Sequence, residues 1–153
     1  MLGRIHFQYR CLHDVVIAYV DWRLETLEDL EVWVQQYETY FEGRFTDKVD
    51  LVLELSKFRL SPRIAPRFRE LRGVILTKYI NLSYRVKEPP MERAMMYAGS
   101  VLNGGPANEF DSIEDALAAL MRDRAEGEPA NGHSSSRLSA ASVRPPLLAA
   151  KSS

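Results

Sequence analysis

The amino-terminal part of the chain contains two kinds of hydrophobic pattern, one typical of strands and one typical of a helix. Residues Phe7–Cys11 and Val15–Asp21 are rich in aromatic and β-branched side chains, which predicts two strands joined by a short turn as a hairpin. After Thr26, apolar residues recur at three- and four-residue steps, the spacing of one face of an amphipathic helix. Thr26 and Asp29 have the spacing of a capping box, and Gly43 is expected to end this helix. The predicted buried face of the helix consists of Leu27, Leu30, Trp33, Val34, Tyr37, Tyr40 and Phe41.

The middle of the chain predicts a buried strand and a second helix. Val49–Leu55 is an almost continuous apolar run, as in a central strand covered on both faces. Ser61 and Pro62 are typical of a helix start, with Ser61 as the N-cap and the proline at the first helical position. Leu82–Val86 follows this helix and predicts the next strand. The expected core face of the second helix is Ile64, Phe68, Leu71, Val74, Ile75 and Tyr79.

The next stretch has a weaker pattern but still alternates helix and strand. A third helix is expected over Met91–Leu102, then a turn at residues 103–106 and a short strand at Glu109–Phe110. Ser112 is expected to cap a last helix, with Asp115 as its capping-box partner. The inward positions expected here are Met95, Met96 and Val101 of the third helix and Ile113, Ala116, Leu117, Leu120 and Met121 of the last.

Strands that alternate with helices in this order predict an α/β fold. We expect a mixed, mostly parallel sheet of four to five strands with about four helices, in one domain over residues 3–125. Residues 126–153 have no apolar periodicity and no aromatic residue, which predicts a disordered tail. This tail is interpreted either as a docking peptide around Pro145 or as an extension without a binding role.

Composition narrows the class of protein. The longest apolar runs, such as Val15–Val20, are far shorter than the ~20 residues that cross a bilayer, and residues 1–20 lack the pattern of a secretion signal. Cys11 is the single cysteine, so no internal disulfide is expected, as in a reducing compartment. A formal net charge of −1 gives no overall attraction to nucleic acid or acidic lipid. We expect a cytoplasmic domain without a nucleic-acid or membrane partner.

Residues suited to catalysis or metal binding are few. His6, Cys11 and His13 are close in the sequence, but a structural zinc site needs four ligands, and no second Cys/His pair follows. No glycine-rich phosphate loop follows a predicted strand. We therefore expect no enzymatic activity, no metal and no cofactor.

Charge is unevenly distributed along the chain. Residues 14–54 contain eleven acidic positions against three basic ones, whereas residues 57–87 contain nine basic positions against one acidic. The first predicted helix is therefore acidic and the second basic. Three interpretations stay open: weak ion pairing between solvated neighbours, binding of an acidic protein or a small anionic ligand to the basic segment, and homo-oligomer formation between acidic and basic helices of different copies.

Over residues 7–121 the order of elements resembles the STAS fold of bacterial anti-sigma-factor antagonists and their relatives. Four stretches carry the resemblance: residues 15–22 (VVIAYVDW) are similar to the second strand, 50–56 (DLVLELS) to the central strand, 72–76 (RGVIL) to the following helix and 110–117 (FDSIEDAL) to the closing strand and helix. The resemblance implies a regulatory protein–protein interaction module of bacterial signalling, whose partner is a regulator or a kinase.

The loop after the central strand departs from that family. Phosphorylated members have Asp-Ser-Ser-Gly or a close variant there, and one serine accepts phosphate; here residues 58–64 are FRLSPRI. A phosphate on Ser61 would meet the N–H groups of a helix start beside Arg59 and Arg63, although Ser61 is also interpreted simply as a helix cap. The candidate partner-binding or phosphoacceptor residues are Ser56, Lys57, Arg59, Ser61, Arg63 and Arg67.

Overall fold

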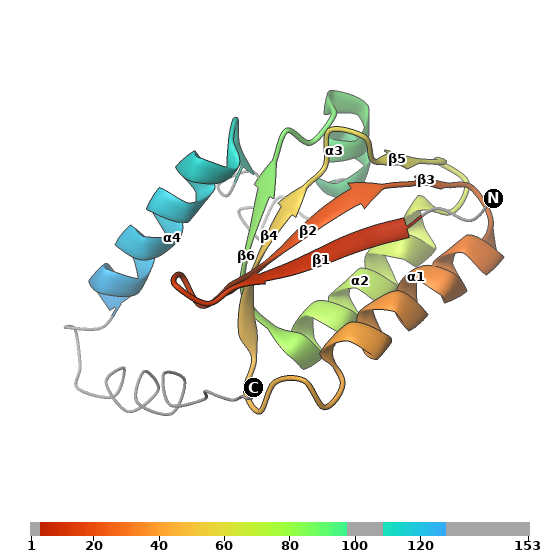
Figure 1. Ribbon diagram of the computed structural model, residues 1–153. Coiled ribbons are helices and arrows are strands. Elements are labelled where there is room, and N and C mark those ends of the chain that lie inside the picture. Colours follow the sequence, from red (N-terminus) through yellow and green to blue (C-terminus); the bar gives the residue numbers. More distant parts are fainter. Residues whose placement is uncertain (1–3, 98–108, 128–153) are drawn as a thin grey trace. The chain divides into compact units, whose positions relative to one another are not determined.

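The computed structural model describes residues 4–97 and 109–127, and a sheet of five strands in the order β1-β2-β4-β6-β7 lies at its centre (Figure 1). β1 (Arg4–Arg10) pairs antiparallel with β2 (Val15–Asp21), which confirms the predicted hairpin. β4 (Val49–Glu54), β6 (Ile80–Val86) and β7 (Glu109–Phe110) continue the sheet in parallel. The predicted fold class, a mostly parallel mixed sheet with helices, is confirmed.

Two long helices, α1 (Leu27–Phe41) and α2 (Ala65–Tyr79), lie against one face of this sheet (Figure 1). α1 begins where the capping box predicts. The Thr26 hydroxyl accepts a hydrogen bond from the Asp29 N–H at 3.1 Å, and the Asp29 carboxylate accepts one from the Thr26 N–H at 3.0 Å. Just beyond the helix, Gly43 has a φ of +76°, a left-handed conformation that favours glycine and turns the chain away.

The core between these helices and the sheet combines aliphatic residues with a group of aromatic rings in contact. The rings of Trp33 and Tyr37 on α1 have centroids 4.6 Å apart, and Phe68 of α2 lies edge-on to Trp33 at 4.9 Å. Such pairs contribute ~0.5–1.5 kcal/mol beyond the burial of their area. Leu51 and Val52 of β4 point to opposite faces and are both 0% exposed, which confirms the central, fully covered strand.

The last two helices are α3 (Pro90–Tyr97) and α4 (Ile113–Gly127). Ser112 caps α4 as predicted, because its hydroxyl accepts a hydrogen bond from the Asp115 N–H at 3.0 Å. The chain divides into two compact units after Ala116, so α4 begins in the first unit and its remaining residues belong to the second. No helix in the described ranges is long and apolar enough to cross a membrane.

Some predictions fall on residues that the structure does not describe. These are the end of the third helix with Val101, the turn at residues 103–106, and the tail from residue 128 onward. The domain boundary at residue 125 remains a prediction.

Three side chains that the helical pattern placed in the core are exposed instead: Leu27 at 60%, Val74 at 63% and Met121 at 43%. Leu27 is the first residue of α1, before the helix has made a full turn along the core. Val74 is one step of about 100° around α2 from the buried Ile75, and the stripe through Phe68 and Ile75 leaves it on the outer surface. The prediction was wrong here because an apolar residue next to a buried position does not share its direction.

The second helix also starts later than predicted. Its N-cap is Ile64, not Ser61, and residues 62–64 form a turn in which the Ile64 N–H donates to the Ser61 carbonyl at 3.2 Å. Ser61 is held elsewhere, because its N–H donates to the carbonyl of Leu24 at 2.9 Å. The predicted N-cap role of Ser61 is therefore wrong.

This contact belongs to a second sheet that the sequence pattern does not predict. β3 (Arg23–Leu24) and β5 (Arg59–Leu60) form a parallel pair of two residues each, separate from the main sheet. Each strand is too short for an alternating pattern to be visible in the sequence. The pair joins the loop after β4 to the segment before α1.

Candidate functional site

The loop that follows β4 is anchored by backbone hydrogen bonds and by one aromatic side chain. The Leu55 N–H donates to the Val86 carbonyl at 2.9 Å, and the Phe58 N–H donates to the Leu55 carbonyl at 3.0 Å. Phe58 is buried, with its ring centroid 5.8 Å from that of Phe68. This anchoring leaves the intervening Ser56 and Lys57 exposed at the carboxyl end of the central strand.

The next residues enter the small sheet of β3 and β5. The Arg59 N–H donates to the carbonyl of Trp22 at 3.0 Å, and Arg59 is paired directly with Arg23. Leu24 and Leu60 are buried, so the preceding side chains, Arg23 and Arg59, point to the exposed side of the pair. The small sheet therefore places two arginines from distant parts of the sequence side by side.

Two more exposed cations follow on the way into α2. Arg63 lies in the turn before the helix, where its backbone N–H donates to the Ser61 hydroxyl at 3.3 Å. Arg67 lies in the first turn of α2 and pairs with Glu70 at 3.0 Å, an exposed contact of little energetic weight. We call the exposed cations of this region the basic edge; its members are Arg23, Lys57, Arg59, Arg63 and Arg67.

Two other arginines of the basic segment, the half-buried Arg69 and the buried Arg85, make contacts within the domain. The Arg69 guanidinium donates to the carbonyl of Met95 on α3 at 2.8 Å. Arg85 is buried in an ion pair of 3.4 Å with Glu88, whose side chain is 2% exposed. Four of the nine cations of this segment, Lys57, Arg59, Arg63 and Arg67, thus belong to the exposed basic edge. Lys78 and Lys87 are also exposed, but they lie at the end of α2 and directly after β6.

The two candidate serines have different surroundings. The exposed Ser56 donates its hydroxyl hydrogen bond to the Glu54 carboxylate at 3.1 Å. Ser61 is half-buried and lies before the turn that precedes α2, so the expected contact with the N–H groups of a helix start does not form. Ser61 therefore lacks the helix-start setting that the sequence predicted for it.

A buried residue outside the basic segment forms a hydrogen bond to the backbone of β5. Glu92 of α3 is 4% exposed, and its carboxylate accepts a hydrogen bond from the Leu60 N–H at 3.1 Å. This contact fixes β5 against the rest of the domain. Neither Glu92 nor Arg23 was identified from the sequence, since each lies more than thirty residues from its partner in the chain.

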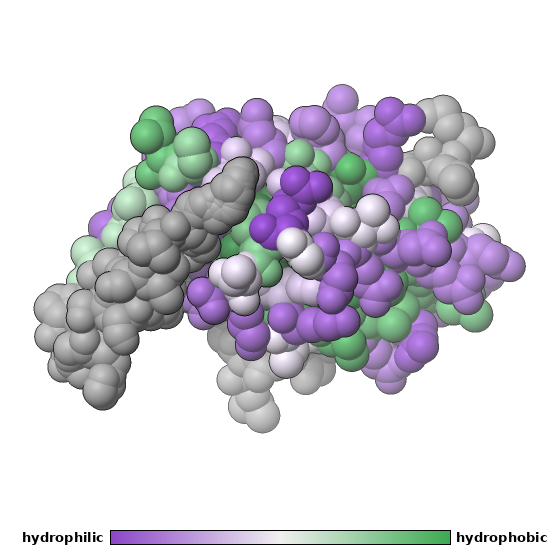
Figure 2. All heavy atoms as spheres, turned by 60° about the horizontal axis from the view of Figure 1, so that its bottom comes forward, coloured by the Kyte–Doolittle hydropathy of each residue, from purple (hydrophilic) through white to green (hydrophobic). Residues whose placement is uncertain are grey.

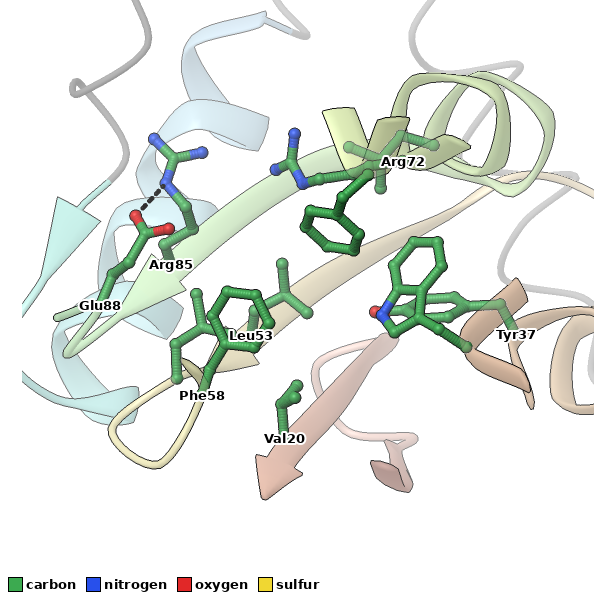
Figure 3. A pocket seen from close by; sticks show the side chains of 11 residues that line it. Val20, Tyr37, Leu53, Phe58, Arg72, Arg85 and Glu88 are labelled. Atoms are coloured by element: carbon green, nitrogen blue, oxygen red, sulfur yellow. Dashed lines mark ion pairs between the residues drawn. The ribbon is translucent and has the colours of Figure 1, made fainter. Parts of the chain in front are cut away.

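A small cavity lies behind the site, between the sheet and the two long helices (Figure 3). Its volume is about 30 Å³, room for about one or two water molecules and far below the several hundred Å³ of a typical ligand site. Phe58 and Leu53 line it on one side, and Arg72 of α2 extends over it in Figure 3. Tyr37 is fully buried here; burial raises the pKa of its hydroxyl, and the nearby Arg72 guanidinium opposes this only in part.

The acidic helix α1 presents its carboxylates on the opposite side from the core. Glu28, Glu31 and Glu38 are exposed. Glu42, just after the helix, accepts a hydrogen bond from the Tyr79 hydroxyl at 2.6 Å and forms an ion pair with Lys78 at 3.7 Å. Tyr79 and Lys78 are the last two residues of α2. Hydrophilic residues also predominate on the face of the molecule in Figure 2, with smaller apolar areas among them.

The described residues offer little to a metal ion. Across residues 4–97 and 109–127, no group of three His, Cys, Asp or Glu side chains is arranged to hold one. Cys11 is exposed in the hairpin turn and not in the strand to which it was assigned.

The sheet order and the position of the loop are consistent with a STAS-like fold, and comparison with solved structures agrees with this. The chain is similar to the murine Solute Carrier 26 family member A9 anion transporter in its inward-facing state, with a TM-score of 0.54 and 17% identity. The match covers 71% of this chain and 18% of the transporter chain, so it concerns a small part of that protein and shows the fold alone. No family model and no curated protein sequence matches the chain.

Proposed function

We propose that this chain is a non-catalytic regulatory module that binds an acidic partner protein through its basic edge. The observation that carries the proposal is the concentration of exposed cations on a short, anchored stretch directly after the central strand. Arg59, Arg63 and Arg67 are all exposed within nine residues, and Arg67 alone of the three has a carboxylate partner among the described residues. Clustered charge of one sign favours association with a surface of the opposite sign.

The STAS-like fold supports an interaction role for the domain. The resemblance in the sequence adds that the setting is bacterial signalling in the cytoplasm and that the partner is a regulator or a kinase. Ser56 and Lys57 lie at the start of the proposed surface, and Ser61 lies between its arginines. Phosphorylation of Ser56 would add negative charge beside Glu54 and weaken the binding of an acidic partner.

The proposal is tested by affinity capture from the native host with a charge-reversed variant. Arg63→Glu with Arg67→Glu removes two exposed cations without touching a buried contact. The matched control is Arg10→Glu with Lys48→Glu, which has the same change in charge at the amino ends of β2 and β4. A partner that is retained by the wild type and the control but lost from the first variant supports the proposal. Equal capture by all three proteins refutes it.

Self-association is the second candidate function, and the exposed carboxylates of α1 favour it. The acidic face of one copy would pack on the basic edge of the next, a head-to-tail contact that forms rings or open chains rather than fixed dimers. Light scattering at low salt measures this directly. A mass that grows with concentration and falls with added salt supports self-association, whereas a constant monomer mass excludes it.

A further inference from the structure

The small sheet of β3 and β5 places two like charges in directly paired positions. Arg23 and Arg59 are directly paired on neighbouring parallel strands, which are ~4.8 Å apart. Both side chains are exposed and leave the sheet on the same side, because Leu24 and Leu60 take the buried side. Like charges in directly paired positions repel each other and weaken strand pairing.

The contacts of the two arginines compensate only part of this charge. The Arg23 Nε lies 4.0 Å from the Glu25 carboxylate, with both side chains more than half exposed. The hydrogen bonds of the Arg59 guanidinium within the described residues involve Nη1 alone, which donates to the carbonyls of Ser56 at 3.2 Å and Phe58 at 2.7 Å. A guanidinium has five N–H donors in a planar fork, so most of the donors of this pair face solvent.

The backbone below the pair is well fixed. The Leu60 N–H is bonded to the buried Glu92 carboxylate at 3.1 Å, and the Ser61 N–H to the Leu24 carbonyl at 2.9 Å. The backbone of the two strands that carry Arg23 and Arg59 is therefore held in place before any ligand binds. A site of this kind loses less conformational entropy on binding than one on a free loop.

We propose that Arg23 and Arg59 together bind a phosphate group carried on a side chain of the partner protein. This inference rests on the proposed function and specifies the chemistry of the partner. A phosphate monoester carries −1.5 to −2 charges near neutral pH, which matches two guanidiniums better than a single carboxylate does. Arginine forks bind phosphate oxygens through paired N–H donors, and Lys57 and Arg63 flank the pair on the same segment.

The test uses the arginine side-chain Nε–H signals in heteronuclear NMR of the full chain. The probes are a short alanine peptide with one phosphoserine, the same peptide with serine, and inorganic phosphate. Arg23→Gln is the test variant, and Arg10→Gln, at the far end of β1, is its matched control. We expect the phosphopeptide to shift the Arg23 and Arg59 signals with saturation, and Arg23→Gln to weaken its binding about five-fold, equal to about 1 kcal/mol. The serine peptide should cause no saturable shifts of these signals. Arg10→Gln should bind the phosphopeptide as tightly as the wild type.

Three results would overturn the inference. The first is the absence of saturable shifts at the pair with the phosphopeptide. The second is an unchanged affinity in Arg23→Gln, and the third is inorganic phosphate that binds as tightly as the phosphopeptide, which would mean a site for the free ion. Failure here is distinguishable from failure of the proposed function. If the captured partner binds Arg23→Gln normally but is lost from the Arg63→Glu, Arg67→Glu variant, the acidic-partner proposal stands and the phosphate site does not.

Discussion

At the scale of single residues, two hydrogen bonds position the proposed site and the helix beside it: one is buried, and the other caps the helix. Glu92 satisfies the backbone N–H of Leu60 under the basic edge, and Thr26 satisfies that of Asp29 at the start of α1. The second contact was predictable because both partners are three residues apart, a known local motif. The first was not, because it joins residues 32 positions apart and requires the packing of α3 to be known.

Replacement of Glu92 should destabilise the domain. Glu92→Ala leaves the Leu60 N–H buried without its acceptor, and we expect the free energy of unfolding to fall by about 1–3 kcal/mol. Urea denaturation followed by circular dichroism measures the change. Glu31→Ala, on the exposed face of α1, is the control and should change stability by no more than about 0.5 kcal/mol. Equal effects of the two substitutions would show that the Glu92 contact has no structural weight.

Loss of the capping box should weaken α1. Thr26→Ala removes the acceptor of the Asp29 N–H, which typically costs about 1 kcal/mol. The same denaturation experiment should place Thr39→Ala, an exposed site within α1, at or above the stability of the wild type, because alanine favours helix. A Thr26→Ala protein as stable as Thr39→Ala would contradict the assigned cap.

At the scale of elements, the sequence predicts what is local and misses what is made by distant segments. The hairpin, α1 and the central β4 follow from periodicity and capping residues close to each other in the chain. The start of α2 was misplaced because Ser61 is drawn into contact with Leu24, 37 positions earlier. The same holds for the candidate site. Lys57, Arg59, Arg63 and Arg67 are close in the sequence and could be proposed from it. Arg23 lies in the acidic part of the sequence and comes close to Arg59 only through strand pairing.

The contact between the ends of α1 and α2 should give the domain a pH-dependent component of stability. The hydrogen bond from the Tyr79 hydroxyl, and next the charge of Lys78, hold the pKa of Glu42 below its ordinary value. A carboxyl whose pKa is lower in the folded than in the unfolded state stabilises the fold above its unfolded-state pKa. This contribution is lost as the pH falls through the folded-state pKa.

Tyr79→Phe tests this contact. It removes the main cause of the shift, so the pKa of Glu42 should rise toward that of an ordinary glutamate, as measured by NMR titration of its side-chain carboxyl. Tyr9→Phe is the matched control, since the Tyr9 hydroxyl donates to the Asp14 carboxylate in the hairpin turn and not to Glu42. A Glu42 pKa that is the same in wild type and Tyr79→Phe would mean that the hydrogen bond does not form in solution.

At the scale of the whole molecule, the net charge of −1 conceals an acidic helix and a basic edge. Four exposed cations of the basic segment, Lys57, Arg59, Arg63 and Arg67, lie between the end of the central strand and the first turn of α2. Binding that depends on such exposed charge weakens with salt, because ions screen it over a Debye length of ~8 Å at physiological ionic strength. An acidic partner should therefore bind less tightly as salt is added.

The most direct measurement is the dissociation constant of the captured partner, determined by titration calorimetry at low and at physiological salt. Wild type, the Arg63→Glu, Arg67→Glu variant and the Arg10→Glu, Lys48→Glu control are compared with one purified partner. We predict a loss of about ten-fold or more for the first variant, equal to about 1.4 kcal/mol or more, and a smaller salt dependence. The control should keep the affinity of the wild type. A dissociation constant that is the same for all three proteins, or insensitive to salt, would contradict binding through the basic edge.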